Sequence, residues 1–158
     1  MSPAEDRHGE ERHGEEERNT AIARRWLTEG ATGNVGLADE IFTHDFRTNG
    51  RTVGTEGPRR NVANRLTGFP DLDVVIEDQI VVADKVVTRL TWRGTHTGDY
   101  SGLPATGRRV EVRALTVFHF RNGKVFENWT VIDQFGLFQQ LGALPPHLLA
   151  AQIPAPGH

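Results

Sequence analysis

Residues 93–142 read RGTHTGDYSGLPATGRRVEVRALTVFHFRNGKVFENWTVIDQFGLFQQLG, and in this stretch two strand-like runs flank one Asn122-Gly123 turn. An Asn-Gly pair closes either a two-residue hairpin or a three-residue loop that ends in a left-handed glycine. The two alternatives differ by one residue of register. Because side chains alternate between the faces of a strand, that residue decides which side chains share a face. We expect the three-residue loop, Arg121-Asn122-Gly123.

The expected register gives the hairpin one mainly apolar face that carries a few small polar groups. Its cross-strand pairs are Phe118 with Phe126, Thr116 with Asn128, Ala114 with Thr130, and Val112 with Ile132. An apolar wall with a few polar groups is typical of a ligand cavity. The opposite face is a mixture that suits a subunit interface or a half-solvated sheet surface, and it carries Arg113, Leu115, Val117, His119, Val125, Glu127, Trp129, Val131 and Asp133.

Length and composition bound the class of protein. The chain has 158 residues, of which 37% are hydrophobic, so we expect one globular domain that can bury a core beside a cavity. The formal net charge is −3, without the basic stripe that nucleic acid or an anionic membrane requires. Cysteine is absent, which excludes disulfides and thiolate metal sites. No apolar run approaches the roughly 20 residues of a membrane span, so a cytoplasmic protein is expected.

Both ends of the chain differ in composition from the middle. Residues 1–18 repeat RHGEE and hold almost no apolar side chain, which predicts a flexible charged tail. His8 and His13 in this tail are five residues apart, a spacing that does not favour one metal ion. Residues 145–158 form a Pro-rich C-terminal tail with a few apolar side chains that suit a neighbouring surface. Residues 19–144 are expected to form the folded domain.

Within that domain, helical patterns come first and strand patterns follow. Helices are predicted from Asn19 to the GATGN stop, over Leu37 to Phe42, and from Pro58 to Phe69. Strands are predicted over Asp73 to Val82 and Lys85 to Arg93, followed by the hairpin and a short helix, Leu137 to Leu141, that ends at Gly142. This order predicts an α+β fold, a cone-shaped α+β barrel in which N-terminal helices close a curved antiparallel sheet around an apolar cavity.

Four motifs connect this fold to a family. They are HDFRTNGR (residues 44–51), RGTHTGDYSGLPATGRRV (93–110), FRNGKVFENW (120–129) and QLG (140–142). With the order of elements, they make residues 19–144 resemble the SnoaL-like polyketide cyclases of the nuclear transport factor two-like superfamily, most of all its anthracycline hydroxylase members. The resemblance implies an enzyme of bacterial aromatic polyketide biosynthesis that needs no cofactor and no metal. This superfamily holds many activities, so function depends on the site.

The family cyclases close a ring by an intramolecular aldol reaction, which the resemblance assigns to an Asp base with a His and a Gln nearby on the last hairpin. In this chain Thr130 stands at the position of the Asp, Thr116 at that of the His, and Ala114 at that of the Gln. A threonine hydroxyl does not act as a base near neutral pH. Ring closure by the family mechanism therefore lacks its acid–base pair.

Other titratable residues do not replace that pair. Asp133 and His119 lie far apart along the hairpin and, in the expected register, on the face opposite the threonines. We interpret Asp133 and Trp129 as structural, with the alternative that the strand bends and turns the carboxylate inward. His96 is placed either at the mouth of the cavity or as a hydrogen-bonded loop histidine.

Polar groups that can still act on a ligand are expected on the hairpin, on the helix at residues 58–69 and in the segment before it. The candidate catalytic residues are Arg47, Arg65, Thr116, Asn128 and Thr130, and the candidate substrate-binding residues are Trp26, Asn49, Trp92, His96, Ala114, Phe118, Phe126 and Ile132. Solvation or ion pairing is the alternative for each arginine. Ordinary core packing is the alternative for each apolar residue.

Three functions remain open. The resemblance to the family's anthracycline hydroxylases implies cofactor-independent hydroxylation of an anthracycline-type aromatic polyketide by dioxygen, in antibiotic biosynthesis and with a separate reductase; a cavity with donors but no base suits that reaction. The GxGxxG signature of a dinucleotide site is absent from the sequence. An aldol cyclase is the alternative, and a non-catalytic small-molecule binding module is the third. We also expect a homodimer through the mixed outer face.

Overall fold

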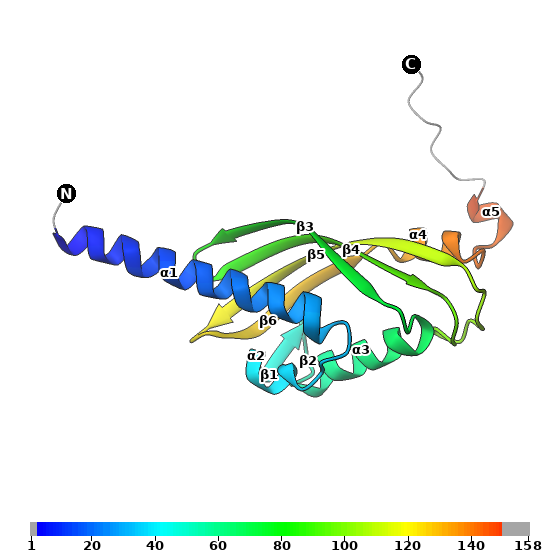
Figure 1. Cartoon of the computed structure of the whole chain (residues 1–158), viewed down its shortest axis with the longest axis horizontal. Coiled ribbons are helices and arrows are strands. Elements are labelled where there is room, and N and C mark those ends of the chain that lie inside the picture. The colour runs from blue at the N-terminus through cyan, green and yellow to red at the C-terminus, as the bar shows by residue number, and fades with distance from the viewer. Residues whose placement is uncertain (1–2, 150–158) are drawn as a thin grey trace, which may run out of the picture.

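The structure is a computed structural model that describes residues 3–149, in which helices pack against one side of a curved six-stranded sheet (Figure 1). The helical elements are α1 (Pro3–Arg25), the π-helical turn η1 (Trp26–Gly30), α2 (Leu37–Ile41), α3 (Glu56–Gly68), α4 (Gln134–Gln140) and α5 (Pro146–Leu149). The strands are β1 (Phe42–Thr48), β2 (Arg51–Thr52), β3 (Asp73–Val82), β4 (Lys85–Thr95), β5 (Arg109–Arg121) and β6 (Lys124–Ile132). The strand order β2-β1-β6-β5-β4-β3 leaves β2 and β3 as edges. The predicted α+β fold is confirmed, with a sheet that stays unclosed.

Alternation along the long strands separates a core face from an outer face. On β5 every second residue from Val110 to Phe120 is buried, while most of the side chains between them are exposed. This period of two is that of a strand with one covered face. The two predicted strands before the hairpin are confirmed as β3 and β4, and β4 continues to Thr95. The core face therefore carries the side chains that surround any cavity under the helices.

The hairpin of β5 and β6 closes on a two-residue turn, so the predicted three-residue loop is wrong. Asn122 and Gly123 both have positive φ, 50° and 76°, as a type I′ turn requires, and the residues on either side of them pair directly. A bulge follows, because Phe120 pairs with Val125 whereas His119 pairs with Glu127. The turn moves the register by one residue from the prediction, and the bulge moves it by one more.

The two shifts add to two residues, which is the period of side-chain alternation along a strand. Most side chains predicted on the inner face therefore lie on it, although each has a different cross-strand partner from the one predicted. Thr116 pairs with Thr130, Phe118 with Asn128, and Ala114 with Ile132. Val125, predicted on the outer face, is instead buried.

Phe126 is the extra residue of the bulge and leaves the inner face. Its ring centroid lies 4.4 Å from that of His119, and the Arg121 guanidinium lies 4.7 Å from the Phe126 centroid.

Helix α1 begins at Pro3, well before the predicted start at Asn19, so residues 3–18 are helical rather than an irregular tail. Glutamate and arginine are good helix formers, and His13 and Glu17 form an i,i+4 pair at 3.0 Å. Near the sheet, Oε1 of Glu16 accepts the backbone N–H of Ala83 at 2.9 Å, which attaches α1 to the β3–β4 turn. The first turns of α1 project beyond the strands (Figure 1).

The end of α1 widens into η1, and this places Trp26 under the sheet. The backbone N–H of Ala31 donates to the Trp26 carbonyl at 2.8 Å, an i→i+5 bond of the kind that defines a π-helical turn. Gly30 is needed here because a Cβ at this position would collide with the Trp26 indole. The turn therefore depends on a glycine that gives room to a buried aromatic ring.

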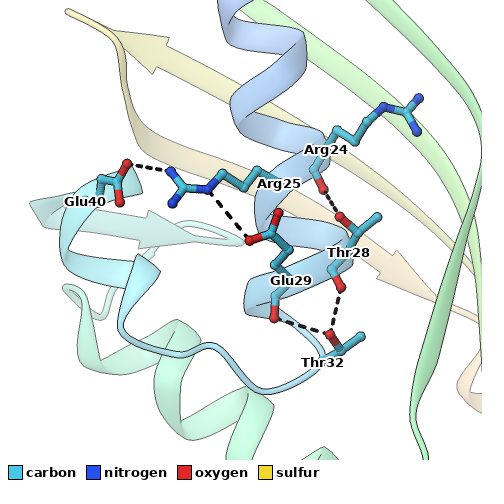
Figure 2. A network of polar contacts seen from close by, with 6 residues as sticks. All are labelled: Arg24, Arg25, Thr28, Glu29, Thr32 and Glu40. Atoms are coloured by element: carbon cyan, nitrogen blue, oxygen red, sulfur yellow. Dashed lines mark hydrogen bonds and ion pairs between the residues drawn. The ribbon is translucent and has the colours of Figure 1, made fainter.

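Polar contacts hold this turn against α2 (Figure 2). The Arg25 guanidinium donates to Oε1 of Glu40 at 2.6 Å and lies 3.8 Å from the Glu29 carboxylate. The Thr28 and Thr32 hydroxyls donate to backbone carbonyls one turn earlier, at 2.9 and 2.7 Å. One arginine thus spans η1 and α2, which fixes the helical layer that carries Trp26.

The C-terminal region of the described chain forms two short helices. Helix α4 starts at Gln134, earlier than predicted, because Asp133 is its N-cap and its Oδ1 accepts the Gly136 N–H at 2.8 Å. Helix α5 lies within the predicted Pro-rich tail, and Ile153 lies outside the described residues. Among residues 3–149, no helix has the length and apolar character needed to cross a membrane.

Candidate functional site

A cavity of about 580 Å³ lies between the inner face of the sheet and the helical elements. Side chains from η1, β1, α3, β4, β5 and β6 line it. Its volume lies in the range of about 300–1,000 Å³ that is common for small-molecule sites. The predicted apolar cavity between the helices and the curved sheet is thus confirmed.

Aromatic rings form one wall of the cavity. The Trp26 and Phe42 rings meet edge to face with centroids 4.8 Å apart, and Phe46 and Phe118 lie 4.5 and 6.2 Å from Phe42. All four residues are buried and line the cavity. Interlocked aromatic rings have few alternative positions. This wall suits a flat apolar ligand.

Small polar groups from the hairpin interrupt the apolar floor. Thr116 Oγ1 and Thr130 Oγ1 lie 2.8 Å apart, and the Asn128 amide nitrogen donates to Thr130 Oγ1 at 3.1 Å. Asn128 Oδ1 is buried and has no hydrogen-bond partner among the described residues. A connected set of hydroxyls and an amide keeps its geometry and retains hydrogen-bonding capacity for a ligand. The corrected register, which puts the threonines opposite one another, creates this set.

Helix α3 contributes a polar strip to another part of the lining. Arg60, Asn61, Asn64 and Arg65 line the cavity, and this i, i+1, i+4, i+5 spacing places them along one side of the helix. The Arg65 guanidinium lies over the Trp92 indole, 5.7 Å from the ring centroid. Burial lowers the pKa of Arg65, although the guanidinium stays charged near neutral pH.

The charges of the lining are all of one sign. Among the described residues, Arg60 and Arg65 are the charged side chains in the lining, which includes no Asp, Glu or His. Thr116 and Thr130 therefore face each other in a cavity whose lining offers no carboxylate or imidazole to act as a base beside them. Such a site can bind, orient and stabilise negative charge, but its own side chains include no base of ordinary strength.

Asn49 lies beside the cavity and bonds to the backbone of β6. Its Oδ1 accepts the Thr130 N–H at 2.8 Å, its amide nitrogen donates to the Thr130 carbonyl at 3.2 Å, and its own N–H donates to the Asn128 carbonyl at 2.9 Å. Its φ of 47° is in the left-handed region that asparagine tolerates better than most residues. Arg47 is exposed and donates to the Gly50 carbonyl at 3.3 Å. Neither side chain lines the cavity, contrary to the prediction.

His96 is fully buried but also lies outside the lining. Its Nδ1 accepts the Thr106 N–H at 3.2 Å, and its ring centroid lies 5.2 Å from that of Phe69. The interpretation as a hydrogen-bonded loop histidine therefore fits, and the placement at the cavity mouth does not. Its fully buried Nε2 has no partner among the described residues.

The remaining candidates belong to the outer face and the helix cap. Trp129 is 53% exposed on the outer face, and Asp133 caps α4 rather than turning inward. His119 Nε2 lies 2.8 Å from the Asp84 carboxylate, and His119 does not line the cavity. The predicted residues that do line the cavity are Trp26, Arg65, Trp92, Ala114, Thr116, Phe118, Asn128, Thr130 and Ile132.

Several lining residues were not found from the sequence. Phe42 was missed because it was predicted to end a helix that in fact stops at Ile41, and Phe46 because residues 44–57 are polar and glycine-rich, so β1 was not expected. Arg60, Asn61 and Asn64 were missed because polar residues on a helix usually face solvent. The usable signal was their spacing, which places them on the same side of α3 as Arg65.

Comparisons with known proteins agree with this architecture. The family described as SnoaL-like polyketide cyclase matches residues 21–141. TsrD from Streptomyces laurentii is 30% identical with a TM-score of 0.72, over 78% of this chain and 94% of that protein. A proposed SnoaL-like polyketide cyclase from Jannaschia sp. CCS1 is 28% identical with a TM-score of 0.74, over 82% and 95%.

A third similar structure is AclR, a proposed hydroxylase from Streptomyces galilaeus, at 25% identity and a TM-score of 0.74, over 86% of this chain and 90% of that protein. No curated protein sequence matches the chain significantly. The family match covers most of the folded part described above, and the structural matches span nearly the whole of their own chains. The chain belongs to the SnoaL-like polyketide cyclase family.

Proposed function

We propose that the protein hydroxylates an anthracycline-type aromatic polyketide with dioxygen and uses no cofactor of its own. The observation that carries the proposal is the cavity lining, which offers arginine, amide and hydroxyl groups where the family resemblance implies an acid–base pair. Two threonines bonded to each other at 2.8 Å occupy the facing positions. The similarity to AclR, itself a proposed hydroxylase, supports the same reaction class.

The proposed reaction starts from the dihydroquinone form of the substrate. Loss of a phenolic proton to solvent gives an anion that transfers one electron to dioxygen, and the radical pair combines to form a C–O bond. After the peroxide takes up a proton from solvent, the ring carbon that carries it loses its hydrogen as a proton. The electron pair of that C–H bond forms a C=O bond and breaks the O–O bond, and the hydroxide released takes up a proton to give water. The products are a hydroxylated quinone and water, so the substrate gives up four electrons and dioxygen accepts four.

In this reaction the protein stabilises negative charge and excludes water. In this proposal Arg65 supplies positive charge to the lining, because its guanidinium is half-buried beside Trp92 and makes no ion pair within residues 3–149. On the hairpin, the second N–H of the Asn128 amide, beside the one given to Thr130, and the Thr116 and Thr130 hydroxyls are the further donors of the lining in this proposal. Arg47 is left out of this set because it is bonded to Gly50 outside the cavity. A separate reductase supplies the dihydroquinone in this proposal.

The test supplies an anthrahydroquinone, prepared anaerobically, to the enzyme in buffer equilibrated with ¹⁸O₂, and follows the product by mass spectrometry. We expect one labelled oxygen per product at a rate above the reaction without enzyme. Asn128→Ala should lower turnover by about 100-fold, the usual loss when a well-placed donor to developing negative charge is removed. Arg24→Gln is the control, because Arg24 is exposed on α1 away from the cavity lining. Turnover without label incorporation contradicts the proposal.

Polyketide ring closure is the second candidate, favoured by the family itself and by the similar Jannaschia protein. Its difficulty is chemical, since an aldol reaction needs a base to remove a proton beside a carbonyl. Efficient anaerobic closure of an uncyclised precursor would establish this alternative. Tight binding of the aromatic substrate with neither reaction would indicate a non-catalytic binding module.

A further inference from the structure

The cavity is an electropositive site in a protein that is acidic overall. The formal net charge of the chain is −3, yet the charged groups in the described lining are the two arginines of α3. Arginine retains its charge at every physiological pH. A ligand with a formal negative charge therefore gains an attraction inside the cavity that the rest of the surface does not provide.

Arg65 combines partial burial with the lack of a carboxylate partner, whereas several other arginines form ion pairs. Arg25 pairs with Glu40 and Glu29, Arg93 with Glu111 at 2.8 Å, and Arg121 with Asp45 at 3.2 Å. Arg65 has no such partner among the described residues and contacts the Trp92 face instead. A half-buried charge without a counterion is unfavourable. A bound anion would remove that penalty.

The surroundings of Arg65 favour a planar acid. The guanidinium presents parallel N–H donors that match the two oxygens of a carboxylate. Asn64 lies next to it in the chain, and Asn61 lies one helical turn before; both line the cavity. The aromatic wall of Trp26, Phe42 and Phe118 offers a surface for the rings of an aromatic acid.

We infer that the substrate binds as a free aromatic carboxylic acid, with its carboxylate on Arg65 and the neighbouring asparagines of α3 and its rings against the aromatic wall. The inference rests on the proposed function in taking the ligand to be a polycyclic aromatic compound. It adds that the acid, and not its ester, is the form that the enzyme selects.

The test measures binding, without dioxygen chemistry, of anthraquinone-2-carboxylate and its methyl ester by isothermal titration calorimetry. We expect the wild-type protein to bind the acid at least 10-fold more tightly than the ester, with the preference falling as salt is added. Arg65→Gln should abolish the preference while ester affinity changes less than 3-fold. Arg24→Gln, with the charge removed from exposed α1, should keep the full preference. Circular dichroism and urea unfolding confirm that the variants are folded.

Equal affinity for acid and ester, binding of neither compound, or a preference that survives Arg65→Gln contradicts the inference. If Arg65→Gln does not fold, Arg65→Lys gives the second readout, because lysine keeps the charge but loses the paired donors. This variant should keep a reduced preference for the acid. An unchanged preference contradicts paired binding of the carboxylate by Arg65. The ¹⁸O₂ experiment separates the two proposals. If the protein prefers the acid but incorporates no labelled oxygen, acid recognition is supported and hydroxylation is refuted. If labelled product forms equally from acid and ester, hydroxylation is supported and acid recognition is refuted.

Discussion

Replacing Thr116 and Thr130 by valine, singly and together, tests the register on which the site depends. Valine keeps the shape of threonine and removes the hydroxyl. Thr116 is 3% exposed, and its hydroxyl lies 2.8 Å from that of Thr130, which also accepts from Asn128 at 3.1 Å. In the register first expected from the sequence, Thr116 would instead lie opposite Asn128. The two registers therefore predict different partners for one buried hydroxyl.

The magnitudes follow from which groups lose a partner. A buried polar group left unsatisfied costs about 1–3 kcal/mol. Thr116→Val leaves one hydroxyl without its partner, so we expect the free energy of unfolding to fall by about 1–2 kcal/mol. Thr130→Val removes a partner from both Thr116 and Asn128, so we expect about 2–3 kcal/mol from the same range. In the double variant both hydroxyls are absent and only the Asn128 amide lacks its partner, so the loss should be smaller than the sum of the single losses by about 1 kcal/mol.

The assay is urea unfolding of the wild-type protein, the two single variants and the double variant, analysed as a double-mutant cycle. A control cycle pairs Thr130→Val with Thr95→Val. Thr95 lies at the far end of β4, where its Oγ1 donates to the Asp71 carboxylate at 2.7 Å, and it shares no partner with Thr116 or Thr130 among the described contacts. This control should be additive within about 0.5 kcal/mol. Additivity of Thr116→Val and Thr130→Val within the same margin would refute the observed register and the polar set built on it.

Three further predictions follow from individual contacts. Asn49→Ala should lower the free energy of unfolding by about 1–3 kcal/mol in urea, because the N–H and carbonyl of Thr130 lose their partners; an unchanged midpoint would show that water replaces the amide. Two hydrogen bonds from Thr95 hold the pKa of Asp71 below its usual range. The stability that these bonds give to the folded protein is therefore present above about pH 4 and is lost as the pH falls through the folded-state pKa. Asp71→Asn should flatten the pH dependence of the unfolding midpoint in that window. We also propose that the outer face, where Leu115, Trp129 and Val131 are 51–73% exposed, pairs with a second copy of the chain; Trp129→Glu should then give monomers in sedimentation velocity, and an identical species for both proteins would contradict this face.

The sequence predicts elements well where hydrophobic periodicity is strong. The alternation over β3, β4 and β5 was sufficient to identify three strands, and the turn at Asn122 and Gly123 was located correctly. The type of turn was not, because a two-residue turn followed by a bulge and a three-residue loop use the same Asn-Gly pair. No residue type marks Phe126 as the bulged position; its ring could equally have filled the inner face.

The limits of prediction at the site have the same physical origin. β1 is followed by Asn49 in a left-handed conformation, and it pairs in parallel with β6, a partner distant in sequence. Local patterns do not reveal such pairing, so Phe42 and Phe46 were not recognised as cavity residues. Likewise α1 starts at Pro3 because charged residues with high helix propensity continue the helix where the absence of apolar residues had suggested an end.

The threonine pair and the unpaired Arg65 both affect the net charge of the cavity lining. An Asp at position 130 would place a negative charge in a lining whose charged groups, within the described chain, are two arginines. Threonine at both facing positions removes that possible counterion, and the two hydroxyls satisfy each other at 2.8 Å. The lining then holds two arginines and no acidic side chain, so an anion that enters the cavity meets no opposing charge from it. In the two proposals made here, the threonines leave the site without a base and also without a carboxylate that would compete with an anionic ligand for Arg65, and both hydroxylation and acid recognition require a stabilised anion.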